Sequence, residues 1–395
     1  MLRKICALIL ALTFCLGAAR ADVLLSEGDK GRDVLLMKQR LQALGYIAQG
    51  DLTQAFSSKT AASLRDFQAL NGLPATGALD AETQALLFSE DALPRPRTTL
   101  VPLATPAPEE PAAPLPERDE EGFLAGEGEF FLEDDVAGRW LYLSRTLQIS
   151  ITRMEDPAIP LVWFETDIRT RDGESFRTAQ TDASRPGKKF QYPYVISRQE
   201  TFVLGFSDDF FANRMGNGET VGIIIRDGQI ISRETNRKRG HHLPNLDMMA
   251  LYPDGSARVY ACNEITAEEL LSQGATDVFS FGPILIRDGQ VEDLVYTYYR
   301  SIEPRHALGM IAPGHFLLLS FQGRTAESKG TTLQRVAETM RQRGVQQALN
   351  LDGGNTMALI FRGRMLNKLA TYKRKKFVRT VTSLIGIGAT DNQAE

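Results

Sequence analysis

The chain has 395 residues and a formal net charge of −4 at pH 7. This length is enough for two or three domains. The slight acidic excess argues against a general binder of nucleic acid or of anionic membranes, because both need a basic surface.

The amino terminus has the layout of a cleavable signal peptide. Arg3 and Lys4 precede an apolar run, Ile5–Leu16, and the small residues of Ala19-Arg20-Ala21 follow. The run is shorter than the roughly 20 residues that a membrane-spanning helix needs. We expect residues 1–21 to be removed and the protein to be secreted or associated with the cell envelope. No stable membrane insertion is expected after cleavage.

The cysteines add little chemistry. A lipidated Cys15 is an alternative to simple cleavage, but the bulky Phe14 precedes it where a lipidation site has a small residue. After cleavage only Cys262 remains, so no internal disulfide can form. A lone cysteine is most often a small buried residue, and we assign Cys262 no role.

Composition divides the remaining chain. Eight prolines lie between Pro94 and Pro116, with few large apolar residues, which is typical of an extended and disordered tether. The acidic stretch Glu117–Asp135 either continues the tether or forms a short amphipathic lid, and we favour disorder. The predicted boundaries are therefore a module at 22–90, a linker at 91–135 and a large domain at 136–395.

The small module has three predicted helices. Apolar residues at helical spacing predict helices over 34–44 and 59–70, which end at Gly45 and at Asn71-Gly72. Asp80 is a good N-cap for a third helix over 80–87. Three short helices with glycine-rich joints predict a compact bundle.

The same residues resemble the three-helix peptidoglycan-binding module over residues 24–88. The similar positions are Gly28-Asp29-Lys30-Gly31-Arg32-Asp33-Val34, Leu41-Gln42-Ala43-Leu44-Gly45-Tyr46, Thr60, Phe67-Gln68, Gly72-Leu73, Thr76-Gly77 and Thr83. Most of them also build the core of the bundle. The resemblance, and not the helical pattern, implies that peptidoglycan is a partner.

The large domain changes to strand patterns. Strands are predicted at Leu147–Ile151, Leu161–Thr166, Phe202–Gly205 and Val221–Ile225, with Asp-Gly turns at 172–173, 227–228, 254–255 and 288–289. One clear helix, 332–343, leads into a strand at 348–351. We predict an α+β fold, a mixed β-sheet with covering helices.

The sharpest local motif is the run Asn350–Met357, where Asp352 ends a buried strand and Gly353 and Gly354 follow. Glycine lets backbone approach a ligand closely, and a carboxylate at a strand end can bind a sugar hydroxyl, bind a cation or act on a reacting atom. Asp-Gly-Gly is also an ordinary turn, so the motif alone does not assign a function.

Further motifs precede this turn in a fixed order, and together they resemble the phosphodiester glycosidase family over roughly residues 139–390. They are Ser280-Phe281-Gly282-Pro283-Ile284-Leu285, Asp288-Gly289, Pro304-Arg305-His306-Ala307-Leu308-Gly309, Gly323-Arg324 and Gly330-Thr331-Thr332-Leu333. The resemblance implies hydrolysis of a sugar-1-phosphodiester at the anomeric carbon of the sugar. It implies a phosphodiester-linked glycan as substrate.

The resemblance carries over residue by residue. The positions that match are Arg305, Arg324, Asn350, Asp352, Gly353, Gly354, Arg379 and Asp209 with Phe210-Phe211. The chain departs from the family at Ser207-Asp208, at Gln322, at His306 and at the shortened stretch Asn355-Thr356.

The chemistry of these residue types agrees with the implied reaction. Arginine offers paired donors to phosphate oxygens, so Arg305, Arg324 and Arg379 are the predicted phosphate contacts. Sugar cleavage commonly uses two carboxylates, and Asp352 and Asp209 are the candidates.

The supporting site residues complete this prediction. His306 could act as a general acid or donate to phosphate. Asn350, Gly353, Gly354 and Asn355 are predicted to contact the substrate. No cofactor or metal site is predicted, because His241-His242 lacks spaced ligand partners. The basic run Lys373-Arg374-Lys375-Lys376 is either a solvated loop or a rim that attracts polyanions.

Two functions remain open. The first is an exported hydrolase of sugar phosphodiesters that peptidoglycan binding holds near its substrate. The second is a cell-wall glycan-binding protein whose glycosidase-like domain has lost turnover through Ser207 and Gln322.

Overall fold

The computed structural model describes residues 23–47, 52–89, 91–94, 115–218, 220–235, 246–298, 301–372 and 375–390. The predicted signal peptide lies outside the described residues, as does most of the proline-rich run. The chain divides into two compact units, residues 1–98 and residues 99–395. Each unit is described by itself.

The small unit contains the three predicted helices, α1 (Arg32–Ala43), α2 (Ser58–Leu70) and α3 (Ala81–Leu87), and two short paired strands, β1 (Val23–Leu25) and β2 (Leu79–Asp80). Ser57 and Thr60 form a capping box at the start of α2. Asp80 caps α3, as predicted, by accepting the N–H of Thr83 at 2.7 Å. Local sequence signals therefore determine where these helices begin.

One buried amide organises the small unit beside its apolar core. Gln68 is fully buried and donates to the carbonyl of Ala78 at 2.9 Å and to the hydroxyl of Thr83 at 3.1 Å. Its Oε1 accepts the N–H of Gly77 at 2.8 Å. The amide thus ties α2 to the segment that leads into α3.

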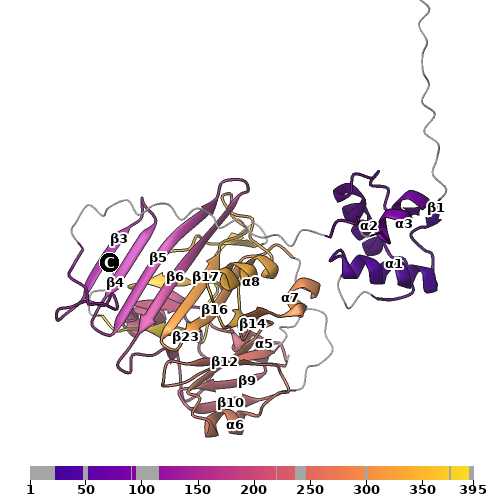
Figure 1. The fold of residues 1–395 in the computed structure, drawn as a ribbon. Coiled ribbons are helices and arrows are strands. Elements are labelled where there is room, and N and C mark those ends of the chain that lie inside the picture. The colour runs from indigo at the N-terminus through magenta and orange to yellow at the C-terminus, as the bar shows by residue number, and fades with distance from the viewer. Residues whose placement is uncertain are drawn as a thin grey trace, which may run out of the picture. The chain divides into compact units, whose positions relative to one another are not determined.

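The large unit is built on a nine-stranded sheet (Figure 1). Its order is β15 (Gln290–Val291), β14 (Ile284–Arg287), β18 (Gln347–Leu351), β16 (Arg305–Ala312), β17 (His315–Phe321), β6 (Leu161–Thr170), β5 (Leu147–Asp156), β4 (Arg139–Leu143) and β3 (Phe130–Asp134). Its predicted members, including β5, β6 and β18, are confirmed.

Two five-stranded sheets and a short hairpin complete the strands. One sheet has the order β20 (Arg364–Met365), β19 (Leu359–Phe361), β8 (Leu204–Phe206), β23 (Ser383–Ile387) and β7 (Arg177–Gln180). The other has the order β10 (Gln229–Arg233), β9 (Ile223–Arg226), β13 (Asp277–Phe281), β11 (Asp247–Leu251) and β12 (Ala257–Tyr260). Strands β21 (Thr371–Tyr372) and β22 (Lys375–Lys376) form the hairpin.

Apolar layers hold these elements together. One core cluster takes side chains from all three large sheets, among them Phe164, Phe206, Phe279 and Leu351. Five helices, α4 (Pro193–Gln199), α5 (Phe211–Gly216), α6 (Ala267–Ser272), α7 (Asp293–Tyr298) and α8 (Leu333–Gln342), complete the unit. Helix α8 covers a face of the nine-stranded sheet (Figure 1), and Thr332 caps it.

The predicted α+β class is confirmed, with one refinement. Every pairing between the strands named above is antiparallel. The sheets that were expected to be mixed are therefore antiparallel, consistent with the Asp-Gly turns. Asp172, Asp227 and Asp288 each have the positive φ that such turns require.

The prediction of disorder was wrong for the acidic stretch Glu117–Asp135. This stretch belongs to the large unit, where β3 pairs with β4 from Phe130 opposite Leu143 to Asp134 opposite Arg139. Glu133 forms ion pairs with Arg362 at 2.5 Å and with Arg364 at 2.8 Å. The local sequence did not indicate an ordered segment, because the arginines that pair with Glu133 lie more than two hundred residues away in the sequence.

We expect Glu133→Gln to lower the free energy of unfolding by about 1–3 kcal/mol in urea titrations, because the buried Arg362 loses a charge-assisted partner. Glu127→Gln is the matched control, since the Glu127–Arg145 pair is exposed on both sides; it should change stability by less than about 0.5 kcal/mol. Equal effects of the two substitutions would show that the ion pairs of Glu133 stabilise the fold no more than an exposed pair does.

Candidate active site

Asp352 lies directly after β18, at the point where the chain leaves the nine-stranded sheet. Its backbone N–H donates to the carbonyl oxygen of Asp208 at 3.1 Å. After the turn, the chain enters β19 of a different sheet. Asp352 is therefore held where the chain crosses from one sheet to another.

The two glycines after Asp352 allow this turn. A Cβ atom on Gly353 would lie 2.3 Å from the carbonyl oxygen of Pro304, far inside van der Waals contact. Gly354 has a φ of 58°, and its N–H donates to the same oxygen at 3.1 Å. Close approach excludes a side chain at 353, and the left-handed conformation favours glycine at 354.

The surroundings of Asp352 raise the pKa of its carboxyl toward neutral pH. The pKa of its carboxyl is raised to about 6, because the effects of burial and of the charge of Asp208 outweigh those of the Thr356 hydroxyl, Arg379 and Arg214, which favour the ionised form. A carboxyl with such a pKa can exchange a proton near neutral pH. Perturbed carboxyls of this kind cluster at functional sites.

Three of the predicted residues form a continuous chain beside the Asp352 turn. Arg324 donates to the carboxylate of Glu303 from Nε at 2.9 Å and from Nη2 at 2.6 Å, and its Nη1 donates to Oδ1 of Asn355 at 3.0 Å. The carbonyl of Asn355 accepts the N–H of Arg379 at 3.1 Å. Nη1 of Arg379 lies 3.5 Å from Oγ1 of Thr356.

Arg305 also lies close to the turn, at the start of β16. Its Cα would be 3.4 Å from a Cβ on Gly353. Its guanidinium donates from Nη2 to the carbonyl and the hydroxyl of Ser301, at 2.8 and 2.9 Å. The structure thus brings the backbone of Arg305 beside the turn, whereas its side chain contacts the loop that precedes β16.

His306 and Asn350 are buried within the nine-stranded sheet. His306 pairs in register with Leu351, and its Nδ1 lies 3.0 Å from the hydroxyl of Ser320. Burial lowers the pKa of His306 to about 3, so the ring is neutral at physiological pH. Asn350 donates to the carbonyl of Gly282 at 2.9 Å. In this structure, neither residue has the exposure that a direct role with substrate needs.

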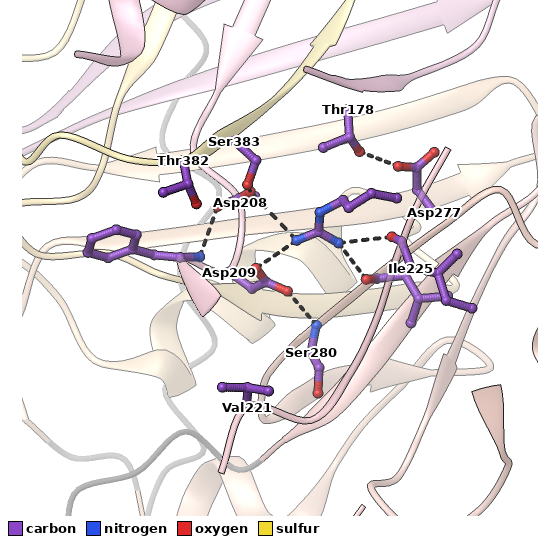
Figure 2. Close-up of polar contacts among 12 residues, drawn as sticks. Thr178, Asp208, Asp209, Val221, Ile225, Asp277, Ser280, Thr382 and Ser383 are labelled. Atoms are coloured by element: carbon purple, nitrogen blue, oxygen red, sulfur yellow. Dashed lines mark hydrogen bonds and ion pairs between the residues drawn. The ribbon is translucent and has the colours of Figure 1, made fainter. Parts of the chain in front are cut away.

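Asp208, whose carbonyl accepts the N–H of Asp352, belongs to a cluster of buried charges (Figure 2). The fully buried Arg226 on β9 donates from Nη2 to Oδ1 of Asp209 at 2.8 Å and lies 3.6 Å from Oδ2 of Asp208. The other carboxylate oxygen of Asp209 accepts the N–H of Ser280 at 2.9 Å. Both oxygens of the predicted second carboxylate are therefore bonded to protein groups.

Asp208 is a site residue that the sequence did not single out. Its carbonyl holds the N–H of Asp352, and its carboxylate accepts the N–H of Phe210 at 2.8 Å and the hydroxyl of Ser383. Burial raises the pKa of this carboxyl, and the charge of Asp209 raises it further. Two adjacent acids at a strand end carry no local signal for which of them faces a site.

At two positions where the sequence departs from the family pattern, the side chain forms hydrogen bonds within the large unit. Ser207 donates its hydroxyl to the carbonyl of Thr356 at 2.9 Å and accepts the N–H of Ala358 at 2.7 Å. Gln322 accepts the N–H of Lys368 at 2.6 Å. Both side chains are buried and bond to backbone groups of the segment that follows Asp352.

Within the described parts of the chain, no three His, Cys, Asp or Glu side chains are grouped so that they could hold a metal ion. Among the same residues, no helix is both long and apolar enough to cross a membrane. His241-His242 and Lys373-Arg374 lie outside the described residues. The backbone of Lys375–Lys376 forms β22.

Comparison with known protein families gives a separate match for each of the two units. Residues 200–388 match the family model described as "Phosphodiester glycosidase". This part of the chain is therefore similar to the phosphodiester glycosidase family. Residues 30–87 match a second model, described as "Putative peptidoglycan binding domain". Every predicted site residue lies within residues 200–388.

Two curated proteins are similar to this chain over 169 residues. The SPbeta prophage-derived uncharacterized protein YomE of Bacillus subtilis (strain 168) is 27% identical, covering 42% of this chain and 26% of that protein. The N-acetylglucosamine-1-phosphodiester alpha-N-acetylglucosaminidase of Mus musculus is 24% identical, covering 38% of this chain and 31% of that enzyme. The chain thus spans about a quarter to a third of the length of these relatives.

Solved structures show more distant likeness. The zebrafish N-acetylglucosamine-1-phosphodiester alpha-N-acetylglucosaminidase catalytic domain, auto-inhibited by its pro-peptide, aligns with a TM-score of 0.48 and 16% identity over 62% of this chain and 83% of that one. A hypothetical protein from Synechocystis aligns with a TM-score of 0.41 and 14% identity over 62% of each chain.

The raised pKa of Asp352 predicts that its charge destabilises the folded state. The folded-state pKa of about 6 lies above the ordinary aspartate value of 3.8, so the wild-type protein loses stability as pH rises from about 4 to 6. Asp352→Asn removes this loss. We expect the variant to exceed the wild type in unfolding free energy by about 1–3 kcal/mol above pH 6, and by little below pH 4.

Asp254→Asn is the control for this measurement, because hydrogen bonds from Ser256 lower the pKa of Asp254 instead of raising it. Unfolding titrations at pH 4 and pH 7 distinguish the two. A stability difference for Asp352→Asn that does not grow with pH would contradict the electrostatic origin.

Proposed function

We propose that this chain is an exported hydrolase that cleaves the glycosidic bond of a sugar-1-phosphodiester in cell-wall or surface glycans. The observation that carries the proposal is the carboxyl of Asp352, held on a glycine turn with Arg379 close enough to favour its ionised form. The turn lies inside a domain of the phosphodiester glycosidase family. The enzyme name of the murine relative supports the same reaction class.

The proposed reaction uses the ionised form of Asp352. A phosphate leaving group needs little protonation, so one carboxylate is sufficient. Asp352 accepts a proton from water as the water oxygen bonds to the anomeric carbon. The bond between that carbon and the phosphate oxygen breaks, which releases the free sugar and a phosphomonoester. The pKa of about 6 makes Asp352 a stronger base than an ordinary carboxylate, yet mostly ionised at pH 7.

Arginine side chains are the proposed phosphate ligands. Arg324 and Arg379 are linked through Asn355 beside the turn, and Arg305 begins β16 next to it. A phosphodiester keeps its negative charge through the reaction, and the planar guanidinium presents paired donors to its oxygens. Asn355 then acts by fixing the position of Arg324.

Asp209 and His306 have positioning roles in this proposal. Asp209 neutralises Arg226 and bonds to Ser280, and His306 is a neutral group in the sheet next to Leu351. A fully buried and fully bonded carboxylate has no free oxygen for a reacting atom. Asn350, on β18 just before Asp352, has a positioning role as well, since it donates to the carbonyl of Gly282.

The alternative, a glycan-binding protein without turnover, rested on Ser207 and Gln322. Both side chains bond to backbone of the segment after Asp352. Their substitution for the family's residues therefore retains the turn. This observation favours the hydrolase over the binding protein.

We further propose that the small unit binds peptidoglycan and holds the hydrolase in the cell envelope. The match of residues 30–87 to a peptidoglycan-binding model supports this role. The unit has its own apolar core, so it can present a binding surface independently. Tethering raises the effective concentration of the enzyme at its substrate without any added active-site contact.

The activity test uses a chromogenic N-acetylglucosamine-1-phosphodiester. We expect the logarithm of kcat/KM to rise with pH and to level off above an apparent pKa of about 6. Asp352→Asn should lower kcat at least a hundred-fold, because Asn keeps the shape but cannot accept the proton.

The more stable unfolding curve expected for Asp352→Asn shows in the same preparation that the variant is folded. Turnover near the wild-type value in a folded Asp352→Asn variant would remove Asp352 from the reaction. A wild-type protein that is inactive on a panel of sugar-1-phosphodiesters would favour the glycan-binding alternative.

The wall-binding role predicts that the full-length protein sediments with insoluble peptidoglycan. Gln68→Leu should reduce the sedimented fraction several-fold, because the buried amide that orders α2 and the approach to α3 is lost. Asp352→Asn, which changes only the large unit, should sediment like the wild type. Sedimentation that is unaffected by Gln68→Leu would move peptidoglycan binding away from the small unit.

A further inference from the structure

A large groove lies beside the Asp352 turn and is not used in the reaction proposed above. Its volume is 920 Å³, which is large enough for several sugar units. The lining side chains come from α4, from the loop after Arg324, from the segment 363–369 and from Phe377 and Val378.

Hydrogen bonds join the groove directly to the proposed phosphate ligands. Asn355, which fixes Arg324, donates to the carbonyl of Ala370 at 2.7 Å and to the carbonyl of groove residue Phe377 at 3.3 Å. The N–H of Thr371 donates to the carbonyl of Arg324 at 3.1 Å. Hydrogen bonds therefore link the groove wall to the residue that positions Arg324.

The groove has an aromatic wall. The rings of Tyr192 and Tyr194 are stacked, with centroids 5.5 Å apart and planes 8° from parallel. Tyr192 is 46% exposed and directly precedes α4, whose Arg198 donates to the carbonyl of Gly363 at 3.0 Å. Stacking and this anchor hold the rings in place, so little side-chain entropy is lost when a ligand lies on them.

The charges around the groove are largely paired. Lys368 forms an ion pair with Glu327, and Arg364 forms ion pairs with Glu133 and Asp135. A polyanion would have to break these pairs. A neutral ligand with many hydroxyls can instead form hydrogen bonds with the paired side chains and leave the ion pairs intact.

We propose that this groove binds a neutral glycan chain, the part of the substrate that extends beyond the phosphodiester. A sugar ring has an apolar C–H face that packs on an aromatic ring, and hydroxyls at its edge that hydrogen-bond to paired charges. Tyr192 is the platform for such a ring. This inference rests on the proposed function for the phosphate end, but the binding it describes does not require turnover.

The experiment titrates the full-length protein with chitotetraose, a neutral probe that has no phosphodiester. We expect Tyr192→Ala to weaken binding about five- to ten-fold, as the loss of one stacking surface predicts. Tyr192→Phe keeps the ring and should bind within about two-fold of the wild type. Phe190→Ala is the matched control, because Phe190 is equally exposed but does not line the groove.

Hydrogen exchange read by mass spectrometry localises the binding, since the small unit is identical in all these variants. Protection of residues 192–199 and 363–369 on addition of chitotetraose, absent in Tyr192→Ala, supports the proposal. Equal affinity of Tyr192→Ala and wild type, or protection confined to residues 23–94, would overturn it. Because the probe has no phosphodiester, an enzyme inactive on every sugar-1-phosphodiester would leave this result unchanged.

Discussion

The buried guanidinium of Arg226 makes the contacts that link the sheets of the large unit. It extends from β9 in one sheet to Asp208 and Asp209, which follow β8 in another. Asp208 in turn holds the N–H of Asp352, at the end of β18 in the nine-stranded sheet. One positive charge thus connects the three sheets that surround the common core.

The groups around Arg226 reduce the free-energy cost of burying its charge. Its guanidinium also donates to the carbonyls of Ile225 and Val278 and lies 4.5 Å from the ring centroid of Phe279. Removing one partner from such a buried pair costs about 3–5 kcal/mol, because the remaining charge is left uncompensated. Three apolar side chains of similar shape in place of Arg226, Asp208 and Asp209 could hold the sheets equally well. They could not raise the pKa of Asp352, which the charge of Asp208 helps to do.

Local signals explain which features could be predicted from the sequence. The caps at Asp80 and Thr332 and the glycines after Asp352 each act within a few residues, so the sequence pattern contains them. Residues 117–135 were predicted to be disordered. Their ordered structure involves ion pairs with Arg362 and Arg364, which lie far away in the sequence. In the same way, no local pattern pairs Arg226 with Asp209 or shows that His306 is buried.

The crossing of the chain from β18 to β19 has a consequence for folding. Asp352 and Asp208 are 144 positions apart, and the hydroxyl of Ser383 reaches Asp208 across 175 positions. Contacts of such sequence separation form late and slowly, because the intervening loops must close first. In a partly folded chain Asp208 therefore lacks its bond to Ser383, which forms only when the last described strand, β23, has joined its sheet.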